Sequence, residues 1–114
     1  ALGLTNLHVN NLVDDECSLF TWGTNSYGEL GQGDLSSRNN PTRVGTAGDW
    51  QSISAGYEHT VAIRKDGTLW AWGRNQYGQL GDGTTTNRTS PVQVGTQTNW
   101  KAISATERNT LALR

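Results

Sequence analysis

The feature that most constrains this chain is an internal repeat of fifty residues. Residues 19–64 align with residues 69–114 without a gap, and 21 of the 46 aligned positions carry the same amino acid. The first unit opens with LFTWGTNSYGELGQGD and the second with LWAWGRNQYGQLGDGT, so a tryptophan, a tyrosine and several glycines recur at fixed places. Self-similarity at such a period is the signature of stacked modules, each of which needs its neighbours to cover its apolar faces.

Each unit contains four short runs of residues that favour β-strands. In the middle of the chain these runs are residues 50–55, 59–64, 68–73 and 91–95. Asp66-Gly67 provides the positive φ angles of a tight hairpin turn between the second run and the third. A glycine-rich loop of residues 74–90 precedes the fourth run, whose opening Pro91 suits an edge strand because it cannot donate a ladder hydrogen bond. These features predict an all-β fold of β-propeller blades with four antiparallel strands each, and about two blades in this chain.

The stretches DGTLWAWGRNQYGQLGDGT and ISAGYEHTVAIRKDG resemble repeats of the regulator of chromosome condensation family. The resemblance covers roughly residues 19–114 and implies a β-propeller, usually of seven blades. It divides the chain into a first repeat at residues 19–68 and a second at residues 69–114. Residues 1–18 form a leader without the signature residues, and this leader could supply a degenerate second strand.

Composition supports a folded chain with few large apolar groups. Leu, Ile, Val and Phe together number 21, a share that on its own would suggest disorder. Disordered chains also have high net charge and few aromatics, whereas this chain has a net charge of −1 with five Trp and three Tyr. The balanced charge attracts neither phosphates nor anionic lipids, and no apolar stretch is long enough to span a bilayer. We therefore expect neither nucleic acid nor a membrane as partner.

His59 is the strongest candidate for acid–base catalysis, because histidine titrates near neutral pH. Its counterpart in the second unit is Asn109, which forms hydrogen bonds but cannot titrate, so a structural hydrogen bond is the favoured interpretation. The histidines and the cysteine, at His8, Cys17 and His59, match no zinc spacing, and no nucleophile motif is present. We predict no enzymatic activity, no metal and no cofactor.

The repeated tryptophans are expected in the core. Trp70 and Trp72 lie two residues apart and therefore share one face of a strand, and Trp22 repeats the placement of Trp72. Trp50 recurs in the same way as Trp100. Periodic aromatics at strand spacing predict packing between blades rather than exposed binding groups.

Differences between the two units indicate where a binding site could lie. Within identical flanks, residues 56–59 read GYEH and residues 106–109 read TERN. The glycine-rich loop also varies between the units. Propeller loops gather at the ends of the blades, where such proteins bind partners, although drift at exposed turns would leave the same pattern. The candidate partner-binding residues are Tyr57, Glu58, Arg74, Gln76, Glu107 and Arg108.

Three functional hypotheses follow. The leading one is a non-enzymatic scaffold or binding module that contacts a protein partner through its end loops. The alternative is a structural or assembly component, for instance of a cell surface or virus particle, that closes a propeller by oligomerisation. The third is guanine-nucleotide exchange on a small GTPase, an activity that the resemblance implies through the family's eukaryotic members.

The strand pattern also predicts how the blades could be completed. The recognisable pattern begins at Leu19 in a third strand and stops at Arg114, at the end of a second strand. Open strand edges and bare inter-blade faces favour pairing with another chain. We expect either a piece of a longer propeller or copies that join by donating residues 100–114 to residues 19–23 of a neighbour, with at least two copies in a ring.

Overall fold

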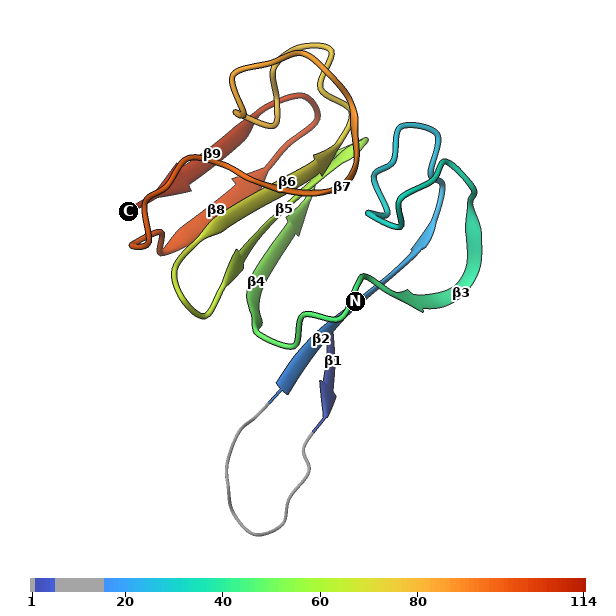
Figure 1. The fold of residues 1–114 in the computed structure, drawn as a ribbon. Coiled ribbons are helices and arrows are strands. Elements are labelled where there is room, and N and C mark those ends of the chain that lie inside the picture. Colours follow the sequence, from blue (N-terminus) through green and yellow to red (C-terminus); the bar gives the residue numbers. More distant parts are fainter. Residues whose placement is uncertain (1, 6–15) are drawn as a thin grey trace, which may run out of the picture.

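The computed structural model of the chain describes residues 2–5 and 16–114, which form strands and loops without a helix. The described strands are β1 (Leu2–Thr5), β2 (Glu16–Gly23), β3 (Arg38–Arg43), β4 (Trp50–Ala55), β5 (His59–Arg64), β6 (Leu69–Gly73), β7 (Arg88–Gln93), β8 (Ala102–Ala105) and β9 (Thr110–Leu113). They make three antiparallel sheets in the orders β1-β2-β3, β4-β5-β6-β7 and β8-β9, which lie side by side in Figure 1. The predicted all-β fold is confirmed.

The central sheet is one complete four-stranded blade. Strands β5 and β6 pair without a break from His59 opposite Gly73 to Ile63 opposite Leu69. The fourth strand differs from its prediction, because β7 begins at Arg88 rather than at Pro91. The proline is tolerated inside the strand because β7 pairs with β6 alone, and the register between them shifts between Ala71 and Gly73.

The two outer sheets are parts of blades. Strands β8 and β9 correspond to β4 and β5, and their pairing of Ala105 with Thr110 reproduces that of Ala55 with Thr60. Strand β2 corresponds to β6 and carries β3 on its outer side. Within the predicted leader of residues 1–18, the segment Leu2–Thr5 forms β1 beside β2, while residues 6–15, His8 among them, lie outside the described residues.

The larger of the two buried clusters among the described residues lies where the β1-β2-β3 sheet meets the central blade. Trp72 and Leu19 are fully buried, and Val44, Trp50 and Ala62 pack with them. The ring centroids of Trp50 and Trp72 lie 5.8 Å apart in an edge-to-face arrangement. This geometry is favourable for aromatic pairs, and it confirms that these two tryptophans belong to the core.

The expectation of a buried tryptophan is wrong at one position. Trp22 is the counterpart of Trp72, yet 47% of its surface is exposed. Trp72 is covered by the glycine-rich loop of the preceding unit, where Gly31 lies so close to the indole that an added Cβ would stand 2.8 Å from its Nε1. Among the described residues, no such loop covers Trp22. Burial of this tryptophan therefore depends on a preceding blade.

Two hydrogen bonds tie the loop of the first unit to the central blade. The backbone carbonyl of Glu29 accepts a bond from the Thr60 hydroxyl at 2.9 Å and another from the Trp72 indole Nε1 at 2.9 Å. The next junction repeats the first contact, since the Thr110 hydroxyl donates to the carbonyl of Gln79 at 2.7 Å. Each glycine-rich loop thus supplies part of the interior of the blade that follows it.

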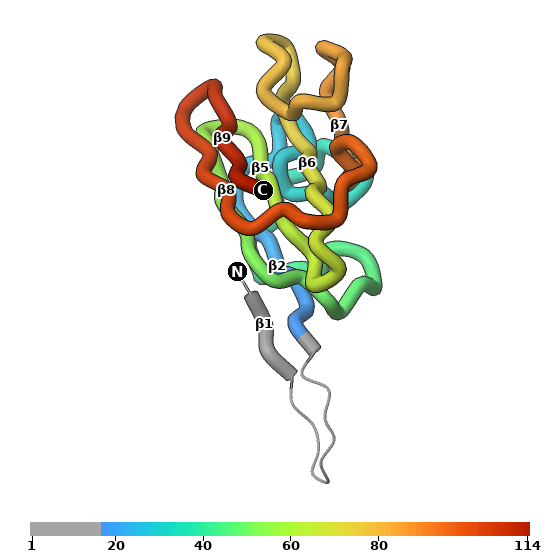
Figure 2. Tube along the Cα trace, turned by 90° about the vertical axis from the view of Figure 1, so that its left-hand side faces the viewer, coloured from blue at the N-terminus to red at the C-terminus, as the bar shows by residue number. Residues whose placement is uncertain are grey.

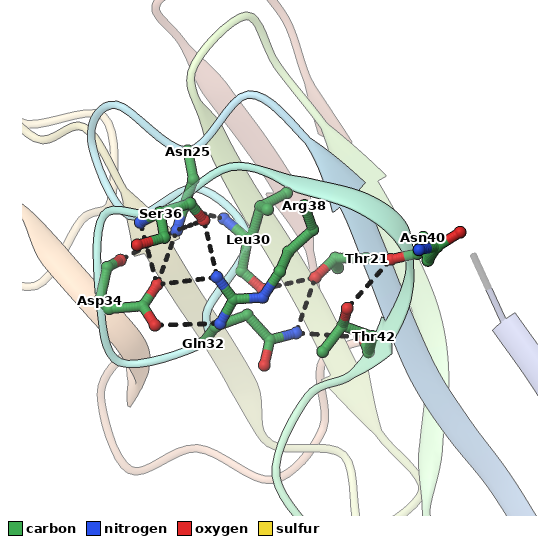
Figure 3. A network of polar contacts seen from close by, with 9 residues as sticks. All are labelled: Thr21, Asn25, Leu30, Gln32, Asp34, Ser36, Arg38, Asn40 and Thr42. Carbon is green, nitrogen blue, oxygen red and sulfur yellow. Dashed lines mark hydrogen bonds and ion pairs between the residues drawn. The ribbon is translucent and has the colours of Figure 1, made fainter.

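A buried asparagine holds each loop in shape. The Asn25 side chain, shown in Figure 3, donates to the carbonyls of Asp34 and Ser36, both at 2.9 Å, and accepts from the Leu30 amide at 3.0 Å. Asn75 does the same in the second unit, and both asparagines are fully buried. Because the polar groups of each asparagine are satisfied, each orders its own loop, and the Asn25 loop carries the Glu29 carbonyl.

His59 is a structural residue of the second junction. Its side chain is 1% exposed, and its Nε2 lies 3.0 Å from the hydroxyl of Thr110 on β9. Burial lowers the pKa of His59 below its usual value of 6.5, because the charged form is disfavoured away from water. The hydrogen bond predicted for His59 is therefore present, with Thr110 as its partner.

The two equivalent tryptophans offer a matched test of the core. Trp72→Ala is expected to lower the free energy of unfolding by about 3–5 kcal/mol, because it empties the interior beneath the loop. Trp22→Ala is expected to cost less than about 1.5 kcal/mol in a dilute, monomeric sample, since this side chain is half exposed. Urea denaturation followed by circular dichroism measures both losses. Equal losses would contradict the assignment of Trp72 to the interior and of Trp22 to the surface.

His59 should make the fold sensitive to acid. A histidine with a lowered folded-state pKa binds a proton more readily in the unfolded chain, so the fold loses stability as the pH falls below about 6.5. His59→Asn, which copies Asn109, should remove this part of the pH dependence between pH 7 and pH 5. Denaturant melts at several pH values compare the two chains. Parallel pH profiles would show that His59 is not buried in its neutral form.

Candidate functional site

Both glycine-rich loops and both turns singled out from the sequence lie at one end of the strands. This end is formed by residues 24–37 and 74–87 together with the turns at 56–58 and 106–109. In Figure 1 it occupies the upper part of the molecule, opposite the β5–β6 turn, and Figure 2 shows the second loop and the β8–β9 turn at the top from the side. The candidate residues therefore share one surface, which we call the loop end.

Alternating tyrosine and arginine side chains cross the loop end. The Arg74 guanidinium carbon lies 4.6 Å from the ring centroid of Tyr27 and 5.4 Å from that of Tyr77. On the far side of Tyr77, the guanidinium carbon of Arg108 lies 4.9 Å from the ring centroid. The resulting arginine–tyrosine row, Tyr27, Arg74, Tyr77 and Arg108, runs from the first unit across the central blade to the β8–β9 turn. Cation–π attraction stabilises such stacks.

Arg74 is fixed at the centre of the row. Its Nη1 donates to the carboxylate of Glu58 at 2.6 Å, and its Nη2 donates to the side-chain oxygen of Gln76 at 2.6 Å. The hydrogen bond to Glu58 raises the pKa of Arg74 above its ordinary value, so the side chain stays charged. The structure thus brings three of the candidate residues, Glu58, Arg74 and Gln76, into one cluster.

The other candidates lie around this cluster. Arg108 is exposed and makes no ion pair among the described residues, although the corresponding position in the central blade, Glu58, is paired with Arg74. Tyr57 is 75% exposed at the β4–β5 turn, and Glu107 is exposed beside Arg108. Arg108 is therefore a stacked cation that can take a carboxylate from outside the chain.

The sequence comparison missed the two tyrosines of the row. Tyr27 and Tyr77 recur in both units, so a search for differences between the units does not select them. Each backbone amide is indeed held by a side chain two residues on, Glu29 or Gln79. The ring of Tyr77 is nevertheless 52% exposed. Arg74 and Arg108 stand at loop positions where the first unit has other residues, and this difference indicates where the row lies.

A groove of about 400 Å³ adjoins the loop end between the β1-β2-β3 sheet and the central blade. Thr21 and Trp22 of β2 line one wall, and Ile53, Tyr57 and Thr60 belong to the other. His59 also borders this groove, but its Nε2 is engaged by Thr110 on the far side of the blade.

The described residues contain no group of three or more His, Cys, Asp and Glu side chains arranged to hold a metal ion. The same part of the chain has no helix long and apolar enough to cross a membrane. The loop end presents aromatic faces, the guanidinium of Arg108 and the Glu58–Arg74 ion pair, and Asp34 and Asp82 are paired there with Arg38 and Arg88.

Comparison with known proteins agrees with this architecture. The Regulator of chromosome condensation (RCC1) repeat matches residues 18–63 and 66–113, and a second form of the same repeat matches residues 50–79. The matches follow the two units found by internal comparison and include the strands of the complete blade.

Three solved structures show the same fold. Prp20p from Saccharomyces cerevisiae is 16% identical with a TM-score of 0.73, covering 86% of this chain and 28% of that one. Human WBSCR16 is 23% identical with a TM-score of 0.71, covering 85% of this chain and 28% of that one. Yeast RCC1 (Prp20), in a complex with Kap60, is 25% identical with a TM-score of 0.69, covering 82% and 25%.

This chain spans about a quarter of the length of these proteins, which fits a chain of about two blades. The two repeat matches together cover far more than half of the chain, and their strands form the antiparallel blades of a propeller. The chain belongs to the regulator of chromosome condensation (RCC1) repeat family of β-propeller proteins.

Proposed function

We propose that this chain is a non-enzymatic protein-binding module whose contact surface is the arginine–tyrosine row at the loop end. The observation that carries the proposal is that Tyr77 of this row is both exposed and ordered. Tyr77 is 52% exposed, yet its ring is held between Arg74 and Arg108. Side chains that are already fixed lose little conformational entropy when a partner binds.

The residue types at the loop end support protein binding. Tyrosine and arginine are enriched among the residues that contribute most to protein–protein affinity. Tyr57 adds a further exposed ring at the neighbouring β4–β5 turn. These side chains come from loops on a rigid sheet, the arrangement in which binding residues are commonly found.

The charges of the row define what a partner should present. Glu58 already neutralises Arg74, so that this pair needs no outside charge. Arg108 has a ring beneath it and no ion pair among the described residues. A planar guanidinium binds a carboxylate through two parallel hydrogen bonds, so we expect an Asp or Glu of the partner to lie against Arg108.

Similar proteins are consistent with a binding role. The structure of Prp20p was described together with its binding to Gsp1p and histones, and yeast RCC1 was solved bound to Kap60. These partners are those of the larger proteins, of which this chain spans about a quarter. They support protein binding as the general mode of action. For this chain we describe the partner only by the chemical groups that it should present.

Of the two other hypotheses, oligomeric assembly requires copies of this chain to complete one another's blades, and it stays an untested hypothesis. Guanine-nucleotide exchange also lacks specific support. No contact of the arginine–tyrosine row points specifically to a GTPase. A shared fold does not imply a shared activity. Exchange activity therefore stays an untested hypothesis.

Peptide selection tests the binding surface directly. A random peptide library displayed on phage is selected against the chain, and the tightest peptide is measured by calorimetry. We expect selected peptides to carry Asp or Glu next to an apolar residue. Tyr77→Ala and Arg108→Ala should each weaken binding at least about tenfold, because they remove the central ring and the free cation.

Arg43→Ala is the matched control, since Arg43 is exposed on β3 and lies outside the row. It should change the dissociation constant by less than about twofold. Circular dichroism confirms that all three variants fold. If the row variants bound as well as the control, or if basic peptides were selected, the proposed surface would be wrong.

A further inference from the structure

A separate pocket of about 390 Å³ lies between the β1-β2-β3 sheet and the central blade. Residues 44–47, in the connection from β3 to β4, line one wall, and Trp50, Arg64 and Trp70 of the central blade belong to the other. The start of β4 and the end of β5, which carry Trp50 and Arg64, lie opposite the loop end in Figure 1. All the lining residues belong to the stretch 31–91, and we call this site the junction pocket.

The Trp50 indole is a buried donor without an acceptor. Its residue is 3% exposed, and its Nε1 has no hydrogen-bond partner among the described residues. The two neighbouring indoles are satisfied. Trp70 Nε1 donates to the Thr68 hydroxyl at 2.8 Å, and Trp72 Nε1 donates to the Glu29 carbonyl at 2.9 Å. A buried N–H that has lost its hydrogen bonds to water is costly unless an acceptor replaces them, and a ligand in the junction pocket can supply one.

Arg64 places a second set of donors at the pocket. Its guanidinium carbon lies 5.6 Å from the ring centroid of Trp50 and 5.4 Å from that of Trp70, so cation–π attraction holds it against both rings. Its Nε donates to Oδ1 of Asp49 at 2.7 Å, while Nη1 and Nη2 have no acceptor among the described residues. No acidic side chain belongs to the described lining of the pocket. Fixed guanidinium nitrogens without an acceptor favour an oxygen anion as ligand.

We propose that the junction pocket binds a small aromatic carboxylate. The carboxylate accepts hydrogen bonds from the terminal nitrogens of Arg64 and from Trp50 Nε1. Asp49 engages only the Nε of Arg64, so the terminal nitrogens are left for the ligand. A pocket of about 390 Å³ lies in the size range of small-molecule sites, which is roughly 300–1,000 Å³.

The apolar part of the lining argues for an aromatic body on this ligand. Trp70 is half-buried, and Val44, Ala47 and Pro91 line the pocket with it. A flat ring packs well against an indole and against such side chains. Because the ligand touches both the connection to β4 and the central blade, its binding should also raise the melting temperature of the chain.

Nuclear magnetic resonance of the indole N–H groups tests the proposal directly. The probes are naphthalene-2-carboxylate and naphthalene-2-carboxamide, which has the same shape without the charge. The carboxylate should shift the Trp50 indole resonance downfield, because this N–H gains an acceptor. The Trp72 resonance should move much less, since its N–H is already bonded to Glu29. Titration calorimetry should give a dissociation constant at least about tenfold lower for the carboxylate than for the amide.

Two variants and a matched control locate the site. Trp50→Phe removes the indole N–H, identifies its resonance and should weaken binding of the carboxylate at least about threefold. Arg38 is the control, because it too is paired with an aspartate, Asp34, at 2.9 Å, but lies outside the junction pocket. Arg64→Gln should weaken binding at least about tenfold, whereas Arg38→Gln should change it by less than about twofold. Circular dichroism confirms folding, and the indole shift in the unaltered chain does not depend on any variant.

The α-amide of N-acetylglutamate distinguishes a small aromatic ligand from an acidic side chain of a protein partner. It carries the carboxylate without a ring and should bind at least about tenfold more weakly than naphthalene-2-carboxylate. Equal binding of this compound or of the carboxamide would overturn the proposal. An unmoved Trp50 resonance at millimolar probe, or a folded Arg64→Gln that binds as tightly as Arg38→Gln, would overturn it as well. None of these outcomes depends on peptide binding at the arginine–tyrosine row.

Discussion

The backbone carbonyl of Glu29 is the point on which the architecture depends. It accepts hydrogen bonds from Thr60 and Trp72, which lie on two adjacent strands of the following blade. A buried carbonyl without such donors would be costly, so the loop and the blade must fold together. The bond is made by the backbone, and the equivalent residue of the second unit is Gln79, whose side-chain oxygen accepts from the tyrosine amide two residues before it, as that of Glu29 does. On the loop side, neighbouring blades are therefore joined through a backbone carbonyl and not through one particular side chain.

The same junction creates the functional surface. Once the loops are held by Asn25 and Asn75, their outer parts project from one end of the blades. Tyrosines on these loops then meet arginines from the neighbouring blade, and the resulting row is ordered without being fully buried. Interior and surface are thus two sides of one loop: its carbonyl faces the core, and its aromatic ring faces the solvent.

Much of this could be predicted from the repeat alone. The four strands of the blade, the buried Trp72 and the hydrogen-bonding role of His59 follow from spacing and from comparison of the two units. Exposure of Trp22 could not be predicted, because burial here depends on a neighbouring blade and not on the residue's own strand. The arginine–tyrosine row also escaped prediction, since stacking across units depends on how far each blade is rotated relative to the next.

A double-mutant cycle across the first junction tests the central claim most directly. Thr60→Val removes the bond to the Glu29 carbonyl, and Asn25→Ala loosens the loop that presents it. If the loop is part of the next blade's interior, the two losses of unfolding free energy should be coupled by at least about 0.5 kcal/mol. Thr60→Val combined with Asn75→Ala, which loosens the other loop, should be additive. Additivity in both pairs would contradict the account.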